Sequence, residues 1–323
     1  MEILAFALAT IVSYMTLGLS IGPLRRAGIL GSDVHKASRP MIPEMGGFAL
    51  ASGFGSAVLL TLALVRFAGW GHQLDVPTLL AVLAVSLIAA LIGLIDDLLS
   101  LSQATKALLP ILAALPLAAI RAGVTEMVIP LVGPIDVGWV YPLILIPVGV
   151  TVAANASNML AGFNGLELGI GIVQMGSLAI LAGILGEAGA LLILLAGLGA
   201  LLGALRFNWF PARVFIGDVG TLTIGAIVAS AVIVGNFEVA GVIVFLPHAV
   251  DFALKARHRF PTEGWEGDRG KDGQLRCPQR SPSSLPQLLL KACGGLRERT
   301  LVLLLIGIEA AFGLAAILLY VLK

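Results

Sequence analysis

Long apolar stretches recur along almost the whole chain, and they constrain its fold more than any other feature. A helix needs roughly 20 consecutive apolar residues to cross the hydrocarbon core of a bilayer. The sequence contains about ten such stretches, most of them free of charge. They cover residues 3–24, 45–65, 76–95, 105–122, 140–157, 168–186, 188–206, 219–237, 239–255 and 300–322. We therefore predict an all-α, polytopic membrane helix bundle, folded as one domain over residues 1–323.

The composition agrees with this prediction and excludes an ordinary soluble enzyme. Hydrophobic residues make up 58% of the 323 residues and charged residues only 12%, against roughly 25% charged residues in soluble domains. So few charged groups cannot cover a water-facing surface. The net charge of +1 gives no sign of a nucleic-acid partner. Cys277 and Cys293 lack the spacing of a zinc site or a disulfide framework, so we expect them to be structural.

The distribution of basic residues predicts how the bundle is oriented. Of the 20 lysines and arginines, all except Arg66, Arg121 and Lys323 fall on one side of the predicted spans. Basic residues favour the cytoplasmic side of a membrane. We therefore expect both termini to face outward or towards the lumen, in a cell membrane or an ER membrane. Residues 124–138 predict a small outer β-hairpin, and residues 255–299 predict a long cytoplasmic loop.

Polar side chains gather at the predicted cytoplasmic ends of the spans. They form five clusters: Asp33, His35, Lys36 and Glu44; Asp96 and Asp97; Asn155, Asn158 and Asn164; Asp218; and Arg257, His258 and Arg259. A transporter of a nucleotide sugar or a lipid would instead need a polar path through the spans. Only Glu309 hints at such a path. The pattern favours an enzyme whose site lies at the membrane surface.

Each cluster has a chemical interpretation and a simpler alternative. The pair Asp96–Asp97 ends an apolar helix, where a cation or an acid–base role would justify two adjacent carboxylates. It could equally be a polar cap at the membrane interface. Lys106 could face this pair, or it could be one more basic residue flanking a span.

The three remaining motifs suit a metal ion and phosphates. In NASNMLAGFNGLELG (155–169), asparagine oxygens suit hard cations, although a plain loop has the same composition. In NWFPARVFIGDVG (208–220), Asp218 could bind a metal or simply cap a helix. The Arg–His–Arg run at 257–259 suits phosphate but could be a juxtamembrane basic patch. Carboxylates, amides and cationic groups are together the parts that magnesium-dependent phosphoryl transfer requires.

These motifs, with KASRPMIPEMGG (36–47), also identify a resemblance over nearly the whole chain. The chain resembles the polyprenyl-phosphate N-acetylhexosamine-1-phosphate transferases. The form N-x-L-A-G-x-N-G-L-E at 158–167 and the single R-H-R-x-P at 257–261 are similar to the eukaryotic dolichol branch and its archaeal relatives. Bacterial peptidoglycan enzymes of the superfamily usually carry D-G-x-D-G and a histidine-rich last loop, which this sequence lacks. A CDP-alcohol phosphotransferase motif is also absent.

The resemblance implies roles for particular residues. Asn158 and Asp218 would hold Mg²⁺, or Mn²⁺ in its place, on a diphosphate. Asp96, Asp97 and Lys106 would be catalytic. The expected substrate-binding residues are Lys36, Glu44, Asn155, Asn164, Arg257, His258 and Arg259. Ser100 stands where the dolichol branch often has Asn, so a supporting polar contact is expected to be weaker there.

The resemblance also implies the reaction and the partners. The phosphate of a polyprenyl or dolichyl lipid would attack UDP-GlcNAc, giving polyprenyl-diphosphate-GlcNAc and UMP, the first lipid-linked step of glycan assembly such as N-glycosylation. The same chemistry with another UDP-N-acetylhexosamine, for a cell-wall or surface polysaccharide, is the alternative. The chain would act within the bilayer, alone or as a homodimer.

Overall fold

Each long apolar stretch of the sequence forms helix in the computed structural model, which describes residues 1–71, 73–129, 133–261 and 266–322. Within these residues, nine helices are long and apolar enough to span a membrane, and the number is ten if one bent helix pair is counted as a single span. The helices are α1 (Glu2–Arg26), α2 (Phe48–Ala68), α3 (Val76–Leu99), α4 (Gln103–Leu108), α5 (Pro110–Ile120), η1 (Tyr141–Leu145), α6 (Ile146–Met159), α7 (Leu166–Leu185), α8 (Ala188–Asn208), α9 (Gly217–Gly235), α10 (Glu238–Val244), α11 (Leu246–Arg257), α12 (Leu285–Ala292) and α13 (Glu298–Val321). The predicted all-α membrane bundle is confirmed.

Two predicted spans are broken at prolines. The span expected at 105–122 is divided into α4 and α5 at Pro110, and Pro247 follows the break between α10 and α11. Proline has no N–H to donate and crowds the preceding turn, so it interrupts a helix. The axes of α10 and α11 differ by 54°. After the bend, α11 packs against α6, α12 and α13.

Three two-stranded antiparallel sheets lie in the connections. The strands are β1 (Leu30–Ser32) with β2 (Met41–Pro43), β3 (Glu126–Ile129) with β4 (Gly133–Asp136), and β5 (Asp268–Arg269) with β6 (Leu275–Arg276). The β3–β4 pair is the predicted hairpin, and the residues that join its strands, 130–132, lie outside the described part. The other two sheets were not predicted, because strands of two or three residues are too short to show alternation.

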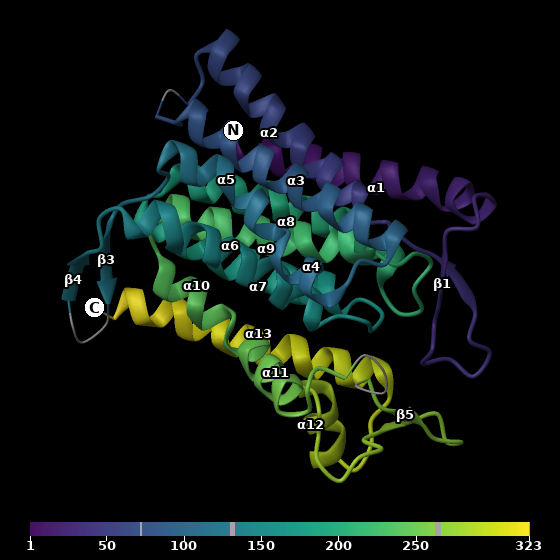
Figure 1. The fold of residues 1–323 in the computed structure, drawn as a ribbon. Helices are drawn as coiled ribbons and strands as arrows, with labels where there is room; N and C mark the ends of the chain where they lie inside the picture. The colour runs from purple at the N-terminus through teal and green to yellow at the C-terminus, as the bar shows by residue number, and fades with distance from the viewer. Residues whose placement is uncertain (72, 130–132, 262–265, 323) are drawn as a thin grey trace.

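Helix α9 occupies the centre of the bundle (Figure 1), where it packs against α3, α6 and α8. Nearly every residue of α9 is buried, because small side chains alternate with β-branched ones around its whole circumference. Helix α3 comes especially close to it at Gly93, where a Cβ atom would clash with the carbonyl oxygen of Asp218. This close approach places the end of α3 beside the beginning of α9.

The two ends of the bundle differ in character. Both termini lie towards the end that carries β3 and β4, while β1, α4, α12 and β5 lie at the opposite end (Figure 1). The motif-bearing helix ends of α3, α6 and α11 and the start of α9 share that second end, which we call the loop end.

Candidate active site at the loop end of the bundle

Lys106 is the centre of the first polar network. Its Nζ atom lies 2.6 Å from Asp96 Oδ2 and 2.6 Å from Asp218 Oδ2, and so joins the end of α3 to the start of α9. Ser100 ends α3 in the left-handed conformation, with φ 50°, so that the chain turns back towards the bundle. The Leu101 amide then donates to Asp96 Oδ1 at 3.0 Å. The structure thus brings together three residues that the motifs singled out separately.

Asp97 makes different contacts from its neighbour Asp96. Its carboxylate accepts the backbone N–H groups of Asp218 at 2.9 Å and Val219 at 3.3 Å, in the first turn of α9. The first N–H groups of a helix lack partners within the helix, and a negative charge there is favourable. Asp97 therefore caps α9 from another helix and holds Asp218 in place.

Asn158 connects the end of α6 to the same network. Its Nδ2 atom donates to Asp218 Oδ1 at 2.6 Å and to Thr221 Oγ1 at 2.9 Å. Thr221 was not singled out from the sequence, although its position three residues after Asp218 places both on one face of a helix. The two predicted metal ligands, Asn158 and Asp218, are therefore in direct contact.

The charges and donor atoms of this network fit a magnesium ion. Three carboxylates, Asp96, Asp97 and Asp218, meet a single ammonium group, so the network carries excess negative charge. Carboxylate and amide oxygens are the ligands that Mg²⁺ takes in proteins, usually together with phosphate. Asn158 can turn its amide oxygen towards an ion by rotating its terminal amide.

A second network joins the first loop to the last helix. Lys36 Nζ lies 3.3 Å from Asp33 Oδ2 and also bonds the Glu298 carboxylate. Asn164 donates from Nδ2 to Asp33 at 3.1 Å and to Glu298 at 2.5 Å, and its Oδ1 accepts the Ala212 amide. Lys36 and Asn164, predicted to bind substrate, are thus both tied to buried carboxylates.

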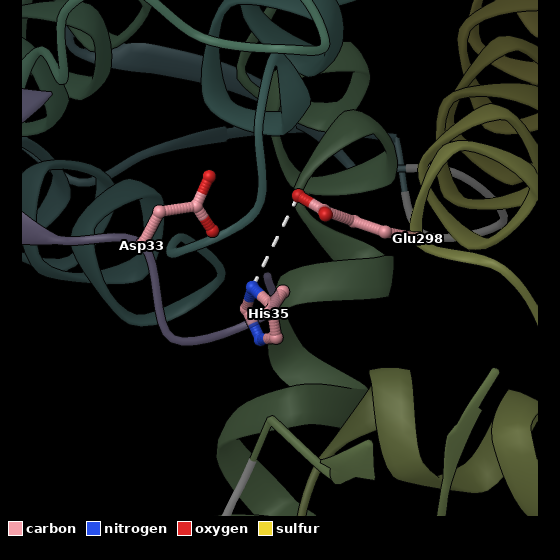
Figure 2. Close-up of side chains that lie close together, drawn as sticks. All are labelled: Asp33, His35 and Glu298. Carbon is pink, nitrogen blue, oxygen red and sulfur yellow. Dashed lines mark ion pairs between the residues drawn. The ribbon is translucent and has the colours of Figure 1, made fainter. Parts of the chain in front are cut away.

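Figure 2 shows Asp33, His35 and Glu298 of this network, whose possible ligand atoms lie within 4.8 Å of one another. His35 Nδ1 is 4.0 Å from Glu298, and the imidazole ring stacks on Phe163 at 4.5 Å. The carboxylate oxygens already accept hydrogen bonds from Lys36 and Asn164, and the lysine supplies the positive charge that a metal would bring. We therefore interpret the group as an ion-pair network. Burial lowers the pKa of His35, and the facing Glu298 and Asp33 oppose this shift.

A cavity of about 320 Å³ separates the two networks. This volume falls in the lower part of the range of about 300–1,000 Å³ that small-molecule sites occupy. Four of the predicted site residues line it: Glu44, Asn158, Asn164 and Asp218. Burial raises the pKa of Glu44, and the negative charge of Asp218 adds to this effect. The aromatic rings of Phe163 and Phe215 form an apolar part of the cavity wall between the polar groups.

The remaining predicted residues lie outside this cavity lining. Asn155 donates to the carbonyl oxygens of Ala107, at 3.0 Å, and Thr151, and so joins α6 to the turn that carries Lys106. Arg257 and Arg259 are exposed at the end of α11, and His258 bonds its own helix through Leu254. These three residues share the loop end with the cavity, but the described contacts do not join them to either network.

The sequence matches known proteins along nearly its whole length. The profile described as glycosyl transferase family 4 matches residues 79–236, which include the Lys106 network. A protein of Saccharolobus solfataricus, provisionally named UDP-N-acetylglucosamine–dolichyl-phosphate N-acetylglucosaminephosphotransferase, is 36% identical over 99% of this chain and 98% of its own length. The chain belongs to glycosyl transferase family 4.

Other relatives of this glycosyl transferase come from eukaryotes and bacteria. The UDP-N-acetylglucosamine–dolichyl-phosphate N-acetylglucosaminephosphotransferase of Schizosaccharomyces pombe is 26% identical over 87% of this chain and 68% of its own length. The phospho-N-acetylmuramoyl-pentapeptide-transferase of Shouchella clausii is 32% identical over 75% of this chain and 76% of its own length. The resemblance predicted from the motifs is confirmed.

Besides Thr221, the motifs of this glycosyl transferase did not single out two glutamates, Glu298 and Glu167. Glu298 begins α13 and bonds Lys36, from which it is 262 residues distant in the sequence. Glu167 lines the cavity and accepts the Gly162 amide at 2.5 Å. Glu167 is part of the quoted middle motif and could have been singled out there. No local pattern marks Glu298.

Proposed function

We propose that this membrane protein transfers GlcNAc-1-phosphate from UDP-GlcNAc to a polyprenyl phosphate of the dolichyl type. The products are polyprenyl-diphosphate-GlcNAc and UMP. The observation that carries the proposal is the meeting of Asn158, Asp218 and Lys106 at the edge of a polar cavity, in a chain of this family. Its relatives in S. solfataricus and S. pombe bear the name of this activity.

The polar cavity suits the nucleotide sugar. Its lining combines the planar apolar rings of Phe163 and Phe215 with the hydrogen-bonding groups of Asn164 and Glu44. An aromatic base can pack on such a wall, and hydroxyl groups of a ribose or sugar can donate to a carboxylate. The diphosphate would then lie towards Asp218, where Lys106 and a bound Mg²⁺ can balance its charge.

An apolar groove of about 310 Å³ suits the tail of the lipid acceptor. It lies between α6, α9 and α10 and is lined by Val152, Ala153 and Phe245 among others. Helix α6 lines the groove with residues between Ile146 and Ala153 and carries Asn158 in its last turn. Ala153 and Asn158 are only about 7.5 Å apart along the helix axis, at 1.5 Å per residue. We propose that the tail lies in this groove with its phosphate towards the end of α6.

The chemistry is an in-line displacement at the phosphorus that bears the sugar. An oxygen of the lipid phosphate forms the new P–O bond, and the bond to UMP breaks with its electron pair leaving on the UMP oxygen. A lipid phosphate has a second pKa of about 6 and is already ionised near neutral pH, so direct attack needs no base. Mg²⁺ held by Asn158 and Asp218 would neutralise charge on the diphosphate. Lys106, which is held between the Asp96 and Asp218 carboxylates, would also face the diphosphate.

The distribution of basic residues and the lining of the two cavities support proposals for the orientation of the protein in the membrane and for its oligomeric state. We propose that the loop end faces the cytoplasm and that both termini lie outside or in the lumen, because the basic residues concentrate at the loop end. Residues 1–323 form one catalytic domain in this proposal. Both the polar cavity and the apolar groove are lined by a single chain, so a homodimer would carry two sites.

The test uses purified protein, a polyprenyl phosphate and UDP-GlcNAc labelled in the sugar, with Mg²⁺. We expect label in the lipid extract and one UMP released for each labelled lipid. A parallel reaction with UDP-MurNAc-pentapeptide decides the donor, and faster turnover of that donor would contradict the GlcNAc proposal. Uptake of label into sealed vesicles without UMP release would indicate a transporter.

A further inference from the structure

Helix α11 buries a stripe of polar residues that the proposed reaction does not use. His248, Asp251 and Lys255 lie at intervals of three and four residues, which places them on one face of the helix. The exposed fractions are 3% for His248, 0% for Asp251 and 6% for Lys255. Charged residues are almost never buried this completely unless they are paired, so the partners of this stripe indicate its role.

Asp251 and Lys255 form a buried ion pair with further contacts on both sides. Lys255 Nζ lies 2.8 Å from Asp251 Oδ2, and Asp251 Oδ1 accepts the Leu285 amide at 2.8 Å, just where α12 begins. Lys255 Nζ also donates to the carbonyl oxygen of Met159. The pair thus connects α11 to α12 and to the end of α6, and α11 packs against both of these helices.

Met159 is the last residue of α6 and directly follows Asn158. The last carbonyl groups of a helix have no partner within the helix, and a positive charge at that end is favourable. Lys255 therefore anchors the α6 terminus at the peptide next to the Asn158 side chain. Asn158 in turn reaches Asp218 at 2.6 Å.

We propose that the Asp251–Lys255 pair is a positioning element of the active site, which holds the end of α6 so that Asn158 stays in register with Asp218. The inference rests on the proposed function only for the role of Asn158 at the diphosphate. Asp251 orients the Lys255 ammonium, and Lys255 holds the Met159 carbonyl. Neither side chain lines the polar cavity, so their effect passes through α6.

The test removes both charges together, because a single change would leave one buried charge unpaired. The double variant Asp251→Asn/Lys255→Met keeps the side-chain lengths close to the original and retains an acceptor for the Leu285 amide. The matched control is Glu309→Gln, which removes a buried carboxylate that faces the same helix at His248, 3.9 Å away, but does not contact α6 through the described bonds. A third variant, Lys255→Arg, keeps the charge.

Two quantities are measured in detergent. The first is the Mg²⁺ concentration for half-maximal transfer, and the second is the affinity for UDP by calorimetry with and without Mg²⁺, which requires no turnover. In the double variant we expect the half-maximal Mg²⁺ concentration to rise about 10-fold or more, as it does when groups that orient metal ligands are lost. The strengthening of UDP binding by Mg²⁺ should weaken to a similar extent. Lys255→Arg keeps the charge on a larger head group, so it should raise the Mg²⁺ requirement only about threefold, and Glu309→Gln should match the wild type.

A folded double variant with the wild-type Mg²⁺ requirement and wild-type UDP binding would overturn the inference. An equal rise in Glu309→Gln would also overturn it, because the effect would then be a general loss of packing. If the double variant does not fold, Lys255→Arg decides: a requirement raised about threefold by its larger head group supports the inference, and no change overturns it. Wild-type protein that binds UDP with Mg²⁺ but transfers no sugar phosphate would contradict the proposed function alone.

Discussion

At the scale of single residues, the proposed active site depends on contacts that balance charge. The Nζ atom of Lys106 lies 2.6 Å from a carboxylate oxygen of Asp96 and of Asp218. The Asp97 carboxylate instead accepts hydrogen bonds from backbone N–H groups at the start of α9. Adjacent carboxylates in the sequence therefore have different partners. Asp96 orients the lysine, whereas Asp97 orients the peptide that carries Asp218.

The first prediction concerns the proposed metal ligands. We expect Asp218→Asn and Asn158→Ala each to lower Mg²⁺-dependent transfer at least about 100-fold, because a lost ligand removes several kcal/mol of transition-state stabilisation. Membrane insertion and the elution profile in detergent should stay as in the wild type. Asp136→Asn in the β3–β4 hairpin is the matched control and should keep full activity. Activity within a few-fold of wild type at saturating Mg²⁺ would contradict the assignment.

The second prediction concerns the pH dependence of stability at His35. Burial lowers the pKa of this imidazole in the folded protein, so the folded state binds fewer protons than the unfolded state below the ordinary pKa of about 6.5. The neutral ring therefore stabilises the fold above about pH 6.5, and this contribution is lost as the pH falls. Glu298, Asp33 and Glu266 oppose the shift, and Lys36 adds to it.

The measurement is the unfolding temperature at about pH 7.5 and about pH 5.5. His35→Phe keeps a planar ring to stack on Phe163 but cannot be protonated. We expect the decrease in unfolding temperature between the two pH values to be smaller in His35→Phe than in the wild type. An equal or larger decrease in the variant would mean that His35 does not contribute to acid destabilisation.

At the scale of helices, the site depends on how closely α3 and α9 pack. Gly93 lies one turn before Asp96 and Asp97, and the absence of a side chain lets α3 approach the backbone of Asp218. The capping contact from Asp97 to α9 is possible only at this separation. The broken helix α10–α11 has a comparable effect on the other side of the site, because its bend brings Lys255 to the end of α6.

The third prediction tests this close approach. Gly93→Ala should lower stability by about 1–3 kcal/mol, the usual cost of forcing extra atoms into a packed interior, and should lower transfer more than 10-fold by separating Asp97 from α9. Gly176→Ala in α7 is the matched control, since nothing lies within 4 Å of a Cβ there. Its stability should stay equal or rise slightly. Unfolding temperature and initial rate measure the two effects, and equal behaviour of the two variants would refute the role of Gly93.

At the scale of the whole molecule, the two ends of the bundle have different tasks. The loop end holds the polar networks and the cavity, while the termini and the β3–β4 hairpin lie towards the other end (Figure 1). Lys36 and Glu298 join the first connection of the chain to its last helix. The cavity is thereby enclosed by parts of the chain that are far apart in sequence.

The fourth prediction tests the orientation of the bundle with a membrane-impermeant maleimide. Cys293 is exposed in the loop that we place in the cytoplasm. In sealed right-side-out vesicles we expect it to react only after the membrane is permeabilised. Gln73→Cys, in the connection between α2 and α3 and in a background with Cys277→Ser and Cys293→Ser, should react at once. The reverse labelling pattern would place the active site on the opposite face.

The sequence by itself determined the membrane class, the β3–β4 hairpin and the family. These follow from local properties, because an apolar stretch of sufficient length must form a helix in a bilayer. It also singled out Asp96, Asp97, Lys106, Asn158 and Asp218, which lie within short motifs. The structure places all five in one network.

Only the tertiary structure decided which partner each polar group has. Glu298 bonds Lys36 across 262 positions, and Lys255 holds the end of α6 across 96 positions. Neither contact leaves a periodic signal, because each depends on where a helix breaks and how closely two helices pack. Tertiary packing also gave the neighbours Asp96 and Asp97 different partners. It placed Lys36 and Asn164 in hydrogen-bonding contact with buried carboxylates. A carboxylate buried in a membrane protein needs a cation or a donor. Lys36 supplies one to Glu298 and Asn164 supplies one to Asp33, each from a distant segment.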